Sequence, residues 1–310
     1  MELRKDYILD RWVIISEARA KRPKQFEDVK QQKEIGTCFF CPGNEGNTPP
    51  EIGRLAENDK WTIRWFPNKF PASSKEGKPE IEKDMFFTHG AAYGSHEVIA
   101  ETPDHDKQLA DLTVDHLAKI LKVYSNRIVE LSKEAKYVLV FKNQGEAAGT
   151  SIIHTHTQVV SLNLVPPLVT DEVKAARKFK SCPYCEIIKK EKQSARFIFE
   201  NASFVAIAPY ASRFNYEAWI LPRKHMKSIT EFSEQEFKEC AELLHKILAK
   251  LASIQADYNF VLHYSPKKAD LHFHIELLPR IANWAGFEFL SNIIINSMPP
   301  EKAAEFYKSG

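Results

Sequence analysis

The sequence predicts an α+β protein made of two copies of one unit, in which antiparallel strands form a sheet and a helix packs on each sheet. The first observation behind this fold class is an internal repeat. A Cys-x-x-Cys pair, a strand, a histidine, a long helix, a strand, a loop and a His-x-His strand occur twice in the same order. The second is hydrophobic periodicity, which switches between the strand and helix types along each copy.

The elements of the first copy follow in order. An early strand is expected from Val13, and the mostly apolar and β-branched stretch HEVIAE predicts a strand over 96–101. Residues 111–135 have apolar side chains at helical spacing behind an Asp/Thr start signal, which predicts a helix. The apolar stretches over 138–143 and 152–162 predict two further strands.

The second copy repeats this pattern. EAWILP predicts a strand over 217–222, and the amphipathic stretch over 231–254 predicts a helix behind a Ser/Glu start signal. Strands are expected over 259–265 and 271–279. When the copies are aligned, ETPDH meets LPRKH and HTHTQ meets HFHIE. We therefore expect two domains, residues 1–165 and 166–310, divided where two prolines follow LNLV.

Composition narrows the possible functions. The 310 residues carry 43 Lys and Arg against 41 Asp and Glu, so the net charge of +2 gives no reason to expect nucleic-acid binding. No secretory signal and no apolar run of membrane-spanning length is present, which predicts a cytoplasmic protein without a membrane partner. Four of the five cysteines form two Cys-x-x-Cys pairs, which in a reducing compartment indicate metal ligands. The fifth, Cys240, is expected to be a core thiol.

The repeat predicts two zinc sites, because tetrahedral zinc takes thiolate and imidazole ligands. Four protein ligands would close each coordination sphere, so both sites should be structural. Unrelated buried thiols and core histidines remain the alternative, and the metal in each site is left open. The proposed ligands are Cys38, Cys41, His105 and His154 in the first site and Cys182, Cys185, His225 and His272 in the second.

The chemical centre is predicted at His156. Alternate residues of a strand share a face, so His154, His156 and Gln158 should project together. The loop NQGEAAGTS lies just upstream, and its small residues let backbone N–H groups approach a phosphate, with Asn143 and Ser151 as further donors. A neutral imidazole beside such a loop suits nucleophilic attack at phosphorus. The alternative is a histidine that only hydrogen-bonds within the core.

Other polar residues carry weaker signals. In the second copy Glu276 replaces the glutamine and would repel phosphate, so that copy is expected to be a scaffold. The basic cluster RAKRP and the segment WFPNKFPA say little by themselves. Histidines without a counterpart in the other copy are interpreted as surface or core residues: His89, His96 and His263.

RAKRP, CFFCPGNEGNTPPEI, FPNKFPA, ETPDH, NQGEAAGTSIIHTHTQ, LHFHIELLPR and AGFEF occur in this order. Together they resemble the galactose-1-phosphate uridylyltransferase family, a branch of the histidine-triad superfamily, over roughly residues 1 to 305.

The resemblance implies two histidine-triad-like halves, the first of them catalytic, and a homodimer. It also implies ping-pong transfer, in which UDP-glucose gives UMP to His156 and galactose 1-phosphate then collects it. Zinc would be held by Cys38, Cys41, His105 and His154. The family's nucleotide, phosphate and hexose contacts would fall on Arg19, Arg22, Asn68, Asn143, Gly149, Ser151, Gln158 and Glu288.

The sequence departs from the family pattern near the active site. The usual proline between the histidines is Thr155, the asparagine-proline before them is Ile152-Ile153, and the aspartate after Asn68 is Lys69. A lysine that contacts the sugar phosphate in well-known members has no match around residues 281–283. The related ADP-glucose phosphorylase branch shares these changes and a second zinc site.

Four functions are therefore considered. Hexose-1-phosphate uridylyltransferase leads, an adenylyl-transferring relative such as ADP-glucose phosphorylase is the runner-up, and a zinc-stabilised nucleotide-binding protein without turnover is the alternative from another class. Hydrolysis of a dinucleoside polyphosphate would need water at the His156 adduct. The partners are a nucleotide sugar and a hexose 1-phosphate, whereas the sequence leaves the base, the acceptor sugar and the oligomeric state open.

Overall fold

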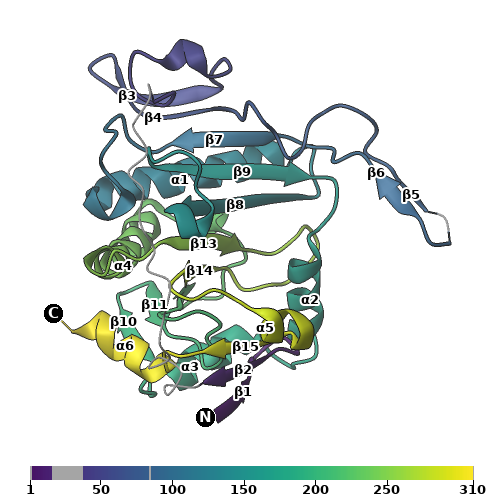
Figure 1. The fold of residues 1–310 in the computed structure, drawn as a ribbon, viewed down its shortest axis with the longest axis vertical. Helices are drawn as coiled ribbons and strands as arrows, with labels where there is room; N and C mark the ends of the chain where they lie inside the picture. Colours follow the sequence, from purple (N-terminus) through teal and green to yellow (C-terminus); the bar gives the residue numbers. More distant parts are fainter. Residues whose placement is uncertain (1, 16–37, 84, 310) are drawn as a thin grey trace.

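The structure is a computed structural model that describes residues 2–15, 38–83 and 85–309. Its centre is one antiparallel ten-stranded sheet, in the order β10-β11-β12-β14-β13-β8-β9-β7-β4-β3 (Figure 1). The first copy supplies one side of the sheet and the second copy the other. The strands are β3 (Gly53–Glu57), β4 (Lys60–Pro67), β7 (His96–Ala100), β8 (Tyr137–Gln144), β9 (His156–Leu162), β10 (Phe197–Glu200), β11 (Phe204–Ile207), β12 (Ala218–Pro222), β13 (Tyr258–His263) and β14 (His274–Pro279).

The two copies meet at a shared ladder. Strand β8 pairs with β13 in antiparallel fashion, with Asn143 opposite Asn259 and Phe141 opposite Val261. The order of strands reads the same outward from this junction on both sides, as the repeat in the sequence requires. The two sheets that the sequence predicts are thus joined into one.

Helices α1 (Val114–Leu131) and α4 (Glu234–Ser253) pack against each other on one face of the sheet (Figure 1). Each begins at a predicted start signal: the side chains of Thr113 and Ser233 accept hydrogen bonds from backbone N–H groups of the first turn. Their apolar faces and the strands beneath them form one core that runs through both copies. Cys240, as predicted, is fully buried within it.

The opposite face of the first copy is less covered. A small cluster lies there, made of Phe40, Trp61, Phe66, Val98 and Ala100. The strand register puts Ala100 opposite His156 and Val98 opposite Gln158. This cluster therefore lies next to the predicted catalytic residues on the same face of the sheet.

The remaining elements lie outside the ten-stranded sheet. Strands β1 (Glu2–Lys5) and β2 (Trp12–Ile15) form a separate sheet with β15 (Ile293–Asn296), so these N-terminal strands sit with the second copy rather than with residues 38–165. Hairpin β5 (Ile81–Lys83) and β6 (Thr88–Gly90) projects from the body (Figure 1). The other helices are α2 (Pro167–Ala176), α3 (Pro183–Glu191), α5 (Gly286–Ser291) and α6 (Pro300–Lys308), with 3-10 turns η2 (Glu45–Asn47), η3 (Leu109–Asp111), η4 (Glu146–Ala148) and η5 (Ile229–Glu231).

After the two prolines the chain enters a helix, because α2 starts at Pro167, where proline suits the first helical turn. One boundary differs from the predictions. The predicted strand over 152–162 begins only at His156, and His154 precedes it. In the described part of the chain, no helix is long and apolar enough to cross a membrane.

Candidate active site and metal centres

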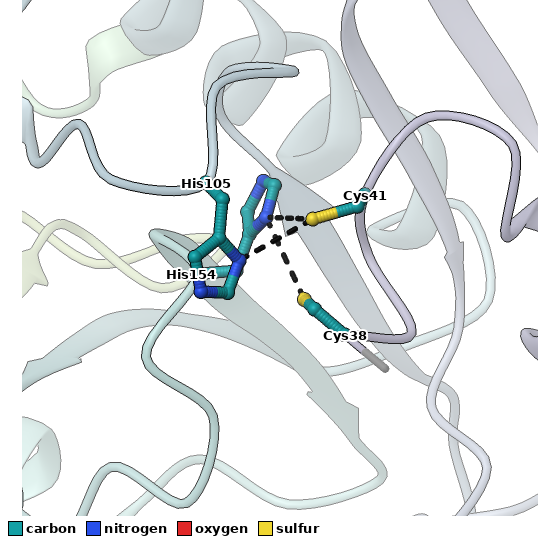
Figure 2. Close-up of side chains that lie close together, drawn as sticks. All are labelled: Cys38, Cys41, His105 and His154. Carbon is teal, nitrogen blue, oxygen red and sulfur yellow. Dashed lines mark hydrogen bonds between the residues drawn. The ribbon is translucent and has the colours of Figure 1, made fainter. Parts of the chain in front are cut away.

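The first predicted metal site is assembled in the structure (Figure 2). Nδ1 of His154 lies 3.7 Å from Sγ of Cys38 and 3.6 Å from Sγ of Cys41, and Nδ1 of His105 lies 3.3 Å from Sγ of Cys41. Zinc–sulfur and zinc–nitrogen bonds of ordinary length span about 3.6 Å along the edge of a tetrahedron. The four ligand atoms therefore fit one tetrahedral ion.

The histidine tautomer at this site also suits a metal. Nε2–H of His154 donates to the backbone carbonyl of Thr102 at 2.7 Å, so Nδ1 carries the lone pair that faces the thiols. A carbonyl partner on the far nitrogen is the usual way in which proteins orient a ligating imidazole.

The second predicted site has the same arrangement of thiols and imidazole nitrogens. Nδ1 of His272 lies 3.7 Å from Sγ of Cys182 and 3.5 Å from Sγ of Cys185, while Nδ1 of His225 lies 3.7 Å from Cys185. Nε2–H of His272 donates to the carbonyl of Pro222 at 2.9 Å. Both sets of four residues can thus hold a metal ion, as the repeat predicts.

His156 begins β9 beside the first metal site. Its Nδ1–H donates to the carbonyl of His154 at 2.8 Å, which leaves the lone pair on Nε2. Burial and the nearby Lys142 ammonium lower the pKa of His156 to about 4, so the ring is neutral at physiological pH. Phe40 meets the ring edge to face, with centroids 5.2 Å apart. The structure thus presents a fixed, neutral imidazole whose Nε2 has no hydrogen-bond partner among the residues that the structure describes.

A buried ion pair supports the backbone around His156. Nζ of Lys142 donates to Glu101 at 2.6 Å, to the hydroxyl of Thr155 at 2.7 Å and to the carbonyl of His156 at 3.0 Å. Neither charged side chain is exposed. Glu101 also accepts from Thr155 and Thr157, both at 2.8 Å or less, and from a tyrosine of α1. The sequence analysis missed this network, because an isolated lysine in a strand gives no signal of its partner.

Gln158 lies on the same face as His156 and contacts a histidine of the neighbouring strand. Oε1 of Gln158 is 2.9 Å from Nε2 of His96, and the amide nitrogen of Asn68 is 3.1 Å from the same atom. His96 is buried, which agrees with its interpretation as a surface or core residue, and it also contacts two predicted substrate-binding residues, which the sequence did not indicate. A cavity of about 230 Å³ opens beside Asn68 and His96.

The predicted phosphate loop joins β8 to β9. Gly145 and Gly149 both have φ near +85°, and a Cβ at Gly145 would lie 1.9 Å from the Asp257 carboxylate, so only glycine fits there. The side-chain oxygen of Asn143 accepts from Asn259 at 2.9 Å, across the junction of the copies. Ser151 is exposed at the end of the loop.

The three remaining predicted contacts are Arg19, Arg22 and Glu288. Arg19 and Arg22 fall outside the described residues. Glu288 is on α5, where its carboxylate accepts a hydrogen bond from Ala285 N–H at 2.9 Å, and within the described part of the chain no hydrogen bond joins it to the residues around His156.

A third group of potential metal ligands lies in the second copy and was not predicted. Glu172, His263, His274 and Glu276 are all buried, and one ligand atom of each lies within 4.8 Å of the others. Burial alone would lower the pKa of His263, but Glu172 and Glu276 outweigh burial and raise it to about 10. Arg213 donates to Glu276 from the other side. The two glutamates therefore already have cationic partners in the protein.

Both copies of the chain are similar to known proteins. The family model for the N-terminal domain of galactose-1-phosphate uridyl transferase matches residues 1–166, and the model described as scavenger mRNA decapping enzyme C-term binding matches residues 181–282. The ADP-glucose phosphorylase of Arabidopsis thaliana is 32% identical, over 98% of this chain and 91% of that protein. The galactose-1-phosphate uridylyltransferase of Thermotoga maritima is 28% identical, over 98% and 96%.

A solved structure extends the likeness to three dimensions. The Arabidopsis thaliana ADP-glucose phosphorylase with bound ADP-glucose superposes with a TM-score of 0.87 at 30% identity, covering 100% of this chain and 99% of that chain.

Proposed function

Because this chain belongs to the galactose-1-phosphate uridylyltransferase family and is therefore a nucleotidyltransferase, we propose that it carries a nucleoside monophosphate on His156 between two phosphate-bearing partners. The donor is a nucleotide sugar, and the acceptor is a hexose 1-phosphate or phosphate itself.

The observation that carries this proposal is the state of the His156 ring. Its Nδ1–H is bonded to the carbonyl of His154, its low pKa keeps the ring neutral, and its Nε2, which no described residue hydrogen-bonds, belongs to a side chain on the same face of β9 as Gln158. A nucleophilic imidazole needs all three features at once, whereas a core histidine needs only partners for both nitrogens.

The reaction has two steps. The Nε2 lone pair attacks the α-phosphorus of the nucleotide sugar, the bond from that phosphorus to the bridging oxygen breaks, and hexose 1-phosphate leaves. The adduct has an N–P bond and a positive ring whose Nδ1–H remains bonded to the His154 carbonyl. An oxygen of the acceptor phosphate then attacks the same phosphorus and the N–P bond breaks.

The remaining predicted residues would bind the substrate. The amide of Gln158 would donate to a non-bridging phosphate oxygen as charge builds there. The glycine loop would approach the phosphates with its backbone N–H groups. We keep the same roles for the other predicted contacts: Arg19, Arg22, Asn68, Asn143, Gly149, Ser151 and Glu288.

Two donors fit this mechanism. The first has UDP-glucose as donor and galactose 1-phosphate as acceptor, in line with the name galactose-1-phosphate uridylyltransferase that two relatives carry. ADP-glucose is the second candidate, favoured by the similarity to the Arabidopsis phosphorylase and by Thr155, whose hydroxyl is built into the Lys142–Glu101 network.

The test is to incubate the protein with either sugar nucleotide alone and measure its intact mass. A gain of UMP identifies the uridylyl reaction and a gain of AMP the adenylyl reaction. His156→Gly should abolish the adduct and keep the metal content. No adduct from either donor would refute the covalent mechanism.

Further features belong to the same proposal. We propose that both Cys/His sets hold structural zinc, that 1–165 and 166–310 are the units of the duplication, and that the protein is a cytoplasmic homodimer, since thiol ligands persist in a reducing compartment. Metal analysis should find two zinc ions per chain, and light scattering would show the mass of a dimer.

A further inference from the structure

We propose that His96 is a positioning residue that fixes the amide of Gln158, so that its NH₂ group points to the substrate phosphate. The inference rests on the proposed function and adds a residue to it. His96 lies on β7, next to β9, and the register puts it opposite Val160, diagonally across from Gln158. It is 7% exposed.

The backbone determines the tautomer of His96. The N–H of Ala72 points at Nδ1 of His96 with a separation of 2.9 Å, and because an amide N–H can only donate, Nδ1 must carry the lone pair. In a neutral imidazole the proton is then on Nε2. Burial lowers the pKa of His96, which agrees with the neutral form.

This proton in turn determines the orientation of Gln158. Nε2–H of His96 requires an acceptor, and Oε1 of Gln158 lies 2.9 Å away. In the opposite amide orientation Nε2–H would face only donors, because Asn68 also presents its NH₂ group to that nitrogen. The Gln158 NH₂ group, which is the part able to stabilise a phosphate, is therefore directed away from His96.

Asn68 does not compete for this proton. Its oxygen Oδ1 accepts from the N–H of Phe70 at 2.9 Å, so the group that faces His96 at 3.1 Å is the NH₂, another donor. The hydrogens of Asn68 are thus left for another acceptor. Because the neutral His96 ring accepts no hydrogen bond from Gln158 or Asn68, the NH₂ groups of both amides remain available to a ligand.

The experiment compares two substitutions in the full-length, metal-loaded protein. In His96→Asn the new oxygen can replace Nδ1 and keep the Ala72 bond, but nothing reaches Gln158. In His96→Gln the new NH₂ can replace Nε2 and keep the Gln158 bond. The rate of nucleotidyl adduct formation, followed by quenched-flow mass spectrometry with the donor that labels the wild type, should fall about ten-fold in His96→Asn, the value of about one hydrogen bond. It should fall only about two-fold in His96→Gln.

A double substitution separates positioning from general damage. Gln158→Ala should slow adduct formation about 100-fold, and His96→Asn should add nothing to it, because its effect passes through Gln158. An equal loss in both backgrounds would overturn the proposal, as would a wild-type rate in His96→Asn. His245→Asn on α4, at a half-buried histidine remote from β7, is the control and should react at the wild-type rate.

The tautomer gives a readout that needs no turnover. Long-range ¹H–¹⁵N spectra of histidine-labelled protein should show His96 protonated on Nε2 alone, and a proton on Nδ1 would overturn the proposal. A wild type that forms no adduct with either donor would instead refute the proposed function, so the two failures can be told apart.

Discussion

His156 and His274 occupy the same place in the two copies but face different surroundings. Each donates Nδ1–H to the carbonyl of the histidine two residues before it, at 2.8 and 3.1 Å, and each follows a metal-site histidine. His156 is 8% exposed and lies on the face of Gln158, whereas His274 is 0% exposed and its Nε2 has no hydrogen-bond partner among the described residues.

The difference arises from the neighbours rather than from the histidine. Phe40 meets His156 edge to face, but its counterpart Tyr184 stacks on His274 with ring centroids 4.9 Å apart. His263 stacks on the other side at 4.6 Å. The second copy therefore has the same backbone geometry at this histidine, but Tyr184 and His263 fill the space beside its ring.

The two histidines should differ most in reactivity. We expect His156→Gly to slow nucleotidyl adduct formation by about 10⁴-fold or more, because no other group can form the N–P bond. The matched substitution His274→Asn should leave adduct formation within about three-fold of wild type. Intact-mass measurements after incubation with the sugar nucleotide give both rates, and a reactive His156→Gly protein would mean that the wrong copy has been assigned.

Lys142 holds the backbone of His156 and pairs with Glu101. In the second copy the residue aligned with Lys142 is His263. Lys142→Met would leave the Glu101 carboxylate buried without its cation and should cost about 3–5 kcal/mol of unfolding free energy. Urea unfolding measures this cost. Lys119→Met, which removes an exposed pair with Glu57, should cost less than about 1 kcal/mol. Equal costs would show that the buried pair has no special structural role.

The metal sites should be alike in binding and unlike in their effect on the reaction. Cys41→Ser and Cys185→Ser should each lose one metal ion per chain, measured by mass spectrometry of the metal. Adduct formation should slow about 10- to 100-fold in Cys41→Ser, because that site holds the backbone before His156. Cys185→Ser should react nearly as fast as wild type, and a matching loss there would contradict the scaffold role.

The smallest expected difference concerns pH. The pKa of His263 is raised to about 10 from an ordinary 6.5, so its contribution to stability is complete below about pH 6.5 and is lost as the pH rises through 10. Between pH 7 and 9 the wild type should lose about 1–2 kcal/mol more unfolding free energy than His263→Gln. Urea unfolding at both pH values tests this, and parallel losses would show that His263 is not charged in the folded protein.

The sequence predicted the parts of the site that are repeated. Recurrence in register selected the eight metal-site residues, and the helices α1 and α4 begin at their predicted caps. The glycines of the loop fit their left-handed backbone positions.

The parts that the sequence did not reveal depend on contacts between strands. His96 reaches Gln158 only because β7 pairs with β9, and Lys142 reaches Glu101 across three neighbouring strands. Strands β3, β4, β10 and β11 also escaped prediction, because they lie outside the stretches in which the two copies are visibly alike in sequence. The register of strand pairing decides such contacts, and a single sequence does not show which strands pair or in which register.

The β8–β13 ladder has a consequence for how such a chain could arise. A single copy would end in an open strand edge, and two identical copies would close that edge by pairing with each other, as a symmetric dimer does. Joining them in one polypeptide makes that association intramolecular and no longer dependent on protein concentration. Once tethered, one subunit of the former pair can lose its chemistry while it still completes the sheet on which the other works.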